Sequence, residues 1–310
     1  MPPASDIDVA IVVASPLPAM TVGKVRHQDV LLEISFVSAE ALARPEVVLS
    51  TYYLAGSFRV DAVLCDPTGQ LRGLQEQVGS LFAEQGWVLR RCQDARQRVE
   101  SHLGRFDPLG PWHDQVTAWL FAAGVTTHIL LVAALRNPTV RLRYLNVREV
   151  LQTYRHPDVY ERLLDLLGCT NLAKERVERH LAALAITFDA ASAVAKTPFP
   201  FSSDITPAAR HIAIDGGEEL IRASDHRESV FWTVATFARC HKILAVDGPR
   251  KRQHELMPAF DELMADLGIA STGDLIAGCR SISEALPMVW ETAVSIVAAN
   301  RDVFAGTGDA

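Results

Sequence analysis

Two carboxylates lie one residue apart near the start of the chain, in the segment Ser5-Asp6-Ile7-Asp8 that opens an apolar, β-branched run. Residues i and i+2 lie on the same face of a strand, so Asp6 and Asp8 are expected to point together from the start of a buried strand. Such a pair suits a hard divalent cation, because Mg²⁺ usually takes one or two carboxylates plus substrate phosphates. The alternative is a polar start of a strand that binds nothing.

A third carboxylate, Glu33, is the only acidic residue inside the second apolar run, Val30–Val37. A carboxylate in such a run is costly to bury unless it is paired or binds a metal. On a strand adjacent to Asp6 and Asp8, Glu33 would complete a cluster of three carboxylates. The alternative is a solvent-facing residue on an edge strand.

The chain changes its periodicity near residue 87, and this change predicts its organisation. Before it we expect strands over Ile7–Val13, Val30–Val37 and Ala62–Leu64, a loop over residues 14–24, the turn Asp66-Pro67-Thr68-Gly69 and an amphipathic helix from Leu71 to Gln85. After it the spacing of apolar residues is helical throughout. The predicted helices are Leu89–Leu103, Trp112–Leu135, Val147–Tyr154, Asp158–Leu167, Asn171–Val194, Pro207–Arg222, Glu228–Val246, Gln253–Asp266 and Ser271–Asn300, with a loop over residues 196–206. The fold class is therefore predicted as α+β, with a small mixed-sheet domain over residues 1–86 and an all-α domain over residues 87–310.

Composition limits the classes of protein that the chain can belong to. An apolar content of 49% and a charged content of 22% are typical of a soluble globular protein, and a formal charge of −7 argues against nucleic acid as a partner. Five dispersed cysteines indicate reduced thiols. We expect no membrane span, because threonines and a histidine interrupt the apolar stretch Trp119–Leu135, and no N-terminal leader. The expected location is cytoplasmic.

An arginine-rich stretch follows in the helical part, around Pro138. Arg136, Arg141, Arg143 and Arg148 could bind phosphate oxygens through paired N–H groups, or they could be solvated charges at helix ends. A general base would also be expected from this part of the chain. The sequence does not rank its candidates, which are His102, His113, His128, Asp114 and Glu149.

Taken in order, three of these segments resemble the nucleotidyltransferase superfamily, which includes the aminoglycoside nucleotidyltransferases and DNA polymerase β. They are Ser5-Asp6-Ile7-Asp8 with the following strand, Glu33 within Leu31–Phe36, and the strand and turn Leu64–Gly69. The resemblance covers residues 5 to about 85, and a helical C-terminal half is of the type that the family has.

The resemblance implies transfer of a nucleoside monophosphate from a nucleoside triphosphate, with ATP as the expected donor, to a hydroxyl of a small molecule such as an aminoglycoside-like cation. Asp6 and Asp8 would bridge two Mg²⁺ ions, and Glu33 would complete the site of the ion that activates the acceptor hydroxyl. Ser5, Arg136, Arg141 and Arg143 are the expected nucleotide-binding residues. A homodimer is compatible with this interpretation.

One departure from the family leaves other interpretations open. The family places a Gly-Ser pair roughly ten residues before the acidic pair, where it holds the triphosphate. Here Met1–Ala4 alone precede Ser5, and Gly56-Ser57 follows the carboxylates, which is the wrong order. Either the sequence starts downstream of the motif, or the chain is a catalytically degenerate member that acts as a binding or regulatory module. A third interpretation is a helical interaction protein, like the partner subunits of minimal nucleotidyltransferases.

Overall fold

Three strands near the N-terminus form one mixed sheet in the computed structural model, which describes residues 4–14, 16–18 and 21–306. Strand β1 (Ile7–Val13) pairs in parallel with β3 (Val30–Ser38), and β3 pairs antiparallel with β2 (Gly23–His27). The order is β1-β3-β2, so β3 is the central strand. The prediction of a strand at each acidic segment is confirmed. Met1–Pro3 and part of the predicted 14–24 loop lie outside the described residues.

The hairpin between β2 and β3 was not predicted, because Lys24 was assigned to the end of a loop. Two residues, Gln28 and Asp29, connect the strands, and both have positive φ angles of 46° and 63°. Such turns are usually made by Asn-Gly or Asp-Gly, so Gln28-Asp29 carries little turn signal. The short strand before it therefore had no recognisable end.

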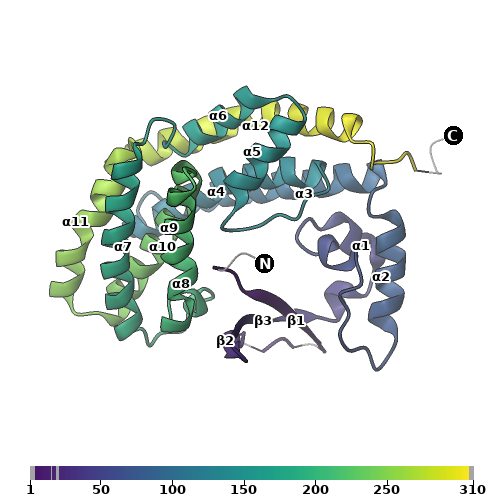
Figure 1. Cartoon of the computed structure of the whole chain (residues 1–310), viewed down its shortest axis with the longest axis horizontal. Helices are drawn as coiled ribbons and strands as arrows, with labels where there is room; N and C mark the ends of the chain where they lie inside the picture. Colours follow the sequence, from purple (N-terminus) through teal and green to yellow (C-terminus); the bar gives the residue numbers. More distant parts are fainter. Residues whose placement is uncertain (1–3, 15, 19–20, 307–310) are drawn as a thin grey trace.

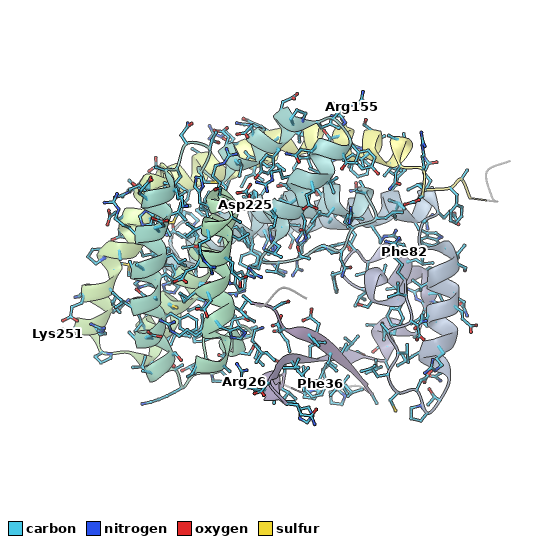
Figure 2. All side chains as sticks on the ribbon, viewed as in Figure 1. Arg26, Phe36, Phe82, Arg155, Asp225 and Lys251 are labelled. Atoms are coloured by element: carbon cyan, nitrogen blue, oxygen red, sulfur yellow. The ribbon has the colours of Figure 1, made fainter. Side chains whose placement is uncertain are left out.

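The two faces of the sheet differ in chemistry. One face carries Asp8 and Glu33 at one end, whereas Val12 and Val37 at its other end pack against a small apolar cluster. The opposite face is apolar, yet Ile7 and Ile11 are 43% and 41% exposed. The prediction that β1 is a buried strand is therefore wrong. Phe36, which belongs to this apolar face, lies on the side of the sheet that is turned away from α4 (Trp112–Ala133) (Figure 2).

Beyond the sheet the chain is helical, as expected, and the helices form an arch with the sheet at its open side (Figure 1). Helices α1 and α2 lie beside the sheet, and α7 to α11 form the other limb of the arch. Their bounds are α1 (Pro45–Ser50), α2 (Gln70–Leu81), α3 (Gln85–Gly104), α4 (Trp112–Ala133), α5 (Arg143–Thr153), α6 (Pro157–Leu166), α7 (Lys174–Val194), α8 (Arg210–Ala213), α9 (Asp215–Arg222), α10 (His226–Asp247), α11 (Arg250–Asp266) and α12 (Thr272–Ala299).

Two of the predicted elements are wrong in detail. The predicted strand Ala62–Leu64 is irregular, and the side chain of Leu64 is 87% exposed. The turn that follows it instead starts α2, where a carboxylate oxygen of Asp66 accepts the backbone N–H of Arg72 at 2.9 Å. The predicted helix Pro207–Arg222 is divided into a 3₁₀ turn, α8 and α9.

Helix α4 is the centre of the large core. It packs against α3, α5, α10 and α12, and it has no polar face, as a helix surrounded by other helices requires. By length and composition alone, α4 and α12 could each cross a membrane, which was not expected for α4. Within this fold, 83% of the apolar window of α4 is buried in the protein, and 44% of that of α12.

A second, smaller core joins the sheet to α1 and α2. It contains buried apolar side chains between residues 42 and 78, and Trp87 packs against it from α3. This cluster fixes the end of the sheet that is opposite to the carboxylates. The domain boundary at residue 86 stays a prediction.

The close approach of α4 to α10 predicts the effect of substituting Gly124. A Cβ there would lie 2.3 Å from Cε2 of Phe231 and 2.5 Å from Nη1 of Arg143. We expect Gly124→Ala to lower the free energy of unfolding by about 2 kcal/mol, because overpacking outweighs the gain in helix propensity. In α2, a Cβ at Gly73 would have no atom within 4 Å, so Gly73→Ala should raise the free energy of unfolding by about 0.5–1 kcal/mol. Urea denaturation measures the free energy of unfolding of both variants. A Gly124→Ala variant that is more stable than the wild type would contradict the close packing of α4 against α10.

Candidate functional site

The three carboxylates singled out in the sequence converge at one end of the sheet. Asp8 and Glu33 are direct partners in the parallel register of β1 and β3, and Asp6 lies two residues earlier on the same face. One oxygen from each of the three side chains lies within 4.8 Å of the others. Asp8 is exposed, whereas Asp6 and Glu33 are half-buried. These are hard oxygen donors at a spacing that is compatible with one divalent cation.

A lysine that the sequence did not single out lies among these carboxylates. Lys24 on β2 is the antiparallel partner of Glu33, and Asp8 on β1 is its parallel partner. Glu33 therefore has a carboxylate on one side and an ammonium group on the other. The Nζ atom of Lys24 lies 2.7 Å from Oε2 of Glu33 and 2.8 Å from Oδ2 of Asp6. Its side chain is only 4% exposed, so the charge depends on these contacts in place of water.

The helical part of the chain adds a fourth carboxylate. Asp204 ends the 3₁₀ turn Ser202–Asp204, and its Oδ1 lies 3.0 Å from Nζ of Lys24. Its other carboxylate oxygen accepts an N–H of Arg239, from α10, at 2.8 Å. The turn comes this near because Gly23 has no side chain: a Cβ there would lie 2.6 Å from the Cβ of Ser203. The positive φ of Gly23, 74°, also requires glycine.

The cluster carries an excess of negative charge. Asp6, Asp8, Glu33 and Asp204 contribute four negative charges, whereas Lys24 and Arg239 supply two positive ones. These six groups sum to a net charge of −2, which the nearby guanidinium of Arg141 offsets in part through its interaction with Asp6. Asp8 is the one carboxylate of the four without an ion-pair partner in the described part of the chain.

Burial and the charges of neighbouring groups shift the pKa values of the residues in the cluster. Desolvation raises the pKa of Glu33, although Lys24 opposes it, and desolvation together with the charge of Asp6 raises the pKa of Asp8. Burial alone would lower the pKa of Lys24, but Asp204, Asp6 and Glu33 raise it above its usual value. Lys24 is therefore charged at neutral pH, and Asp8 and Glu33 are the carboxylates that gain most from a further cation.

Two of the expected phosphate-binding residues lie next to the cluster. The guanidinium of Arg141 donates to the carbonyl oxygens of Ala4 at 2.8 Å and of Gly216 at 3.3 Å, which fixes the start of β1 to α9. The Ser5 hydroxyl donates to the carbonyl oxygen of Asp6 at 3.3 Å. Both therefore stay candidates for contact with a substrate at the acidic cluster.

The other two expected phosphate-binding residues do not belong to this site. Arg143 is 1% exposed, donates from Nε to the carbonyl of Val140 and lies with its guanidinium 3.9 Å from the ring centroid of Phe231. That group is enclosed by the helices and has no ion pair with the cluster, so its position does not support the prediction that Arg143 binds phosphate. Arg136 lines a different pocket.

The residues that sequence reasoning missed are Lys24, Asp204 and Arg239. A recognised hairpin would have placed Lys24 opposite Glu33, whereas no local pattern links Asp204 or Arg239 to the sheet. Of the suggested general bases, Asp114 is paired with Lys242 at 2.7 Å and His128 is buried against the carbonyl of Thr139.

Protein-family models, curated proteins and solved structures give no match to this chain. The candidate site therefore rests on its own geometry and charge. The resemblance of the acidic segments to nucleotidyltransferases has no independent support from these comparisons.

The position of Lys24 predicts competition with a divalent cation. In Lys24→Met, three negative charges would be unpaired, so we expect the free energy of unfolding without added metal to fall by about 3 kcal/mol. Mg²⁺ should then raise the melting temperature of the variant more than that of the wild type. The matched control is Lys251→Met, since Lys251 is exposed on α11, far from the sheet (Figure 2). Equal effects of Mg²⁺ on Lys24→Met and the wild type would contradict the competition.

Proposed function

We propose that this protein is a Mg²⁺-dependent nucleotidyltransferase that transfers a nucleoside monophosphate from ATP to a hydroxyl of a small molecule. One observation carries the proposal: Asp6, Asp8 and Glu33 converge from adjacent strands within 4.8 Å, in a cluster with more carboxylates than cations. Nucleotidyl transfer needs a site that holds divalent cations against a triphosphate, and carboxylates on a rigid sheet supply it.

The donor set fits Mg²⁺, since all of its atoms are carboxylate oxygens. Asp6 and Asp8 would hold the ions between them, and Glu33 would complete the coordination on the central strand. When bound, two such ions would neutralise charge on the attacking and leaving oxygens of an in-line displacement.

Other residues of the chain have roles that follow from their positions. Asp204 is the carboxylate that the helical part brings to the cluster, where its ion pairs with Lys24 and Arg239 position the ammonium group. Arg141 and Ser5, at the start of β1, are the candidates to contact the triphosphate. Lys24 balances the carboxylates and would have to yield some of its contacts when cations bind.

The charge of the molecule favours a cationic acceptor. The formal charge is −7, and the excess charge at the cluster has the same sign. A hydroxylated, aminoglycoside-like cation would be attracted to such a site. We place this reaction in the cytoplasm, in keeping with the five free, dispersed cysteines.

A second candidate function is supported by Lys24 itself. Its ammonium already contacts three carboxylates, as a resident counter-ion does in a protein that binds no metal. In this case the chain would keep the nucleotidyltransferase-like arrangement and act as a binding or regulatory module. The two functions differ in whether Mg²⁺ and ATP bind together at the carboxylates.

The proposal predicts the effect of removing one carboxylate. Asp8→Asn keeps the size of the side chain but removes a charge, so we expect it to weaken binding of ATP in the presence of Mg²⁺ at least about tenfold, measured by calorimetry. The control is Asp29→Asn in the β2–β3 turn, where the side chain is exposed and Asn tolerates the positive φ of 63°. Equal affinities of Asp8→Asn and the wild type would overturn the metal site, and absence of Mg²⁺-dependent binding in the wild type would favour the second function.

A further inference from the structure

A pocket of about 210 Å³ lies between the segment after α1 and the loop that joins α4 to α5. None of its lining residues belongs to the acidic cluster. Phe82, which forms part of its wall, lies near α1 and α3, apart from Arg26 on β2 (Figure 2). The Gly56 of the misplaced Gly-Ser pair also lines it.

The charged residues of this pocket all have one sign. Arg59, Arg91 and Arg136 line it, and no carboxylate is among its lining residues in the described part of the chain. Arg91 is 1% exposed and donates to the backbone carbonyls of Leu49 and Phe82. Arg59 donates to the carbonyl of Leu135 at 2.8 Å. These partners are neutral groups at the ends of helices, so they orient the guanidinium groups but leave a net positive charge.

The energetic cost of this arrangement is visible at Arg91. Burial, together with a smaller contribution from the charge of Arg59, lowers the pKa of Arg91 to about 10. Two guanidinium groups that repel each other gain from an anion placed between them. Arg136 is exposed at the same pocket and has no ion-pair partner in the described chain, so it is free to bind such an anion.

The remaining walls are mostly apolar. Phe82 is covered by Arg59 and Arg91, whose guanidinium carbons lie 5.2 and 4.3 Å from its ring centroid. Tyr52, Leu135 and other apolar side chains complete the lining. The volume is below that of drug-sized ligand sites and suits a small organic group. The pocket therefore has room for an organic group next to the anion.

We propose that this pocket binds a small organic phosphate monoester, with its phosphate between Arg59, Arg91 and Arg136 and its organic part against Tyr52 and Phe82. Phosphate fits better than carboxylate, because it has more oxygens for three guanidinium groups and carries up to two charges. Gly56 leaves the mouth of the pocket open, because a Cβ there would lie 2.4 Å from Oδ1 of Asn137 and displace that side chain. The site is independent of the proposed nucleotidyl transfer.

The experiment uses the full chain in EDTA, so that the acidic cluster cannot contribute through a metal. Calorimetry with phenyl phosphate is compared with phenol, which lacks the charge, and with inorganic phosphate, which lacks the ring. Phenyl phosphate should bind the wild type at least about tenfold more tightly than either. The test variants are Arg136→Gln and Arg59→Gln, which alter exposed side chains and leave the core intact. The control is Arg280→Gln on α12, an exposed arginine outside the pocket.

We expect each test variant to weaken phenyl phosphate binding about tenfold and the control to leave it unchanged. Gly56→Ala should also weaken it, because the added methyl group moves Asn137 into the mouth. The proposal is overturned if phenyl phosphate does not bind at millimolar concentration, if Arg136→Gln and Arg280→Gln bind it alike, or if inorganic phosphate binds as tightly as the ester. A failure of Mg²⁺ and ATP to bind would not affect this result.

Discussion

The arrangement of the whole N-terminal region depends on one desolvated ammonium group, that of Lys24. Carboxylates from the start of β1, from the centre of β3 and from the helical region share it at 2.7–3.0 Å. A buried ion pair adds little to stability compared with apolar packing, but an unpaired charge at the same place is strongly destabilising. The contacts of Lys24 therefore specify the register of the hairpin and the position of the sheet against the helices more than they add to the free energy of folding.

This constraint explains why the sheet turns its charged face towards the helices. A sheet with one apolar face normally packs that face on the core. Here Ile7 and Ile11 stay half-exposed, and the carboxylates face Asp204 and Arg141 instead. The sheet is held at its carboxylate end by Lys24 and Arg141 and at its other end by the small core around α2. Such an arrangement keeps an acidic cluster accessible at the boundary between a rigid sheet and the helical part, where substrate sites are commonly found.

Local patterns in the sequence predicted the parts of this structure that local physics determines. Alternation placed Asp6 and Asp8 on one face, and an isolated acid in an apolar run identified Glu33 as the third carboxylate. Helical periodicity predicted every long helix, because an amphipathic or fully apolar helix shows its pattern within its own segment of the sequence. The failures were non-local. Lys24 lies on a hairpin whose turn has unusual residues, Asp204 reaches the sheet from a distant segment, and Arg143 is enclosed by helices that its own sequence does not reveal.

We propose that the acidic cluster is a divalent cation site in which the Lys24 ammonium competes with the cation. The most direct measurement is an anomalous difference map from crystals of the full chain soaked in Mn²⁺, which takes the same oxygen ligands as Mg²⁺. We expect a peak within coordination distance of Asp6, Asp8 and Glu33, with the Lys24 ammonium moved away from at least one carboxylate. Crystals in which Lys24 keeps its contacts and no Mn²⁺ peak lies among the carboxylates would contradict it.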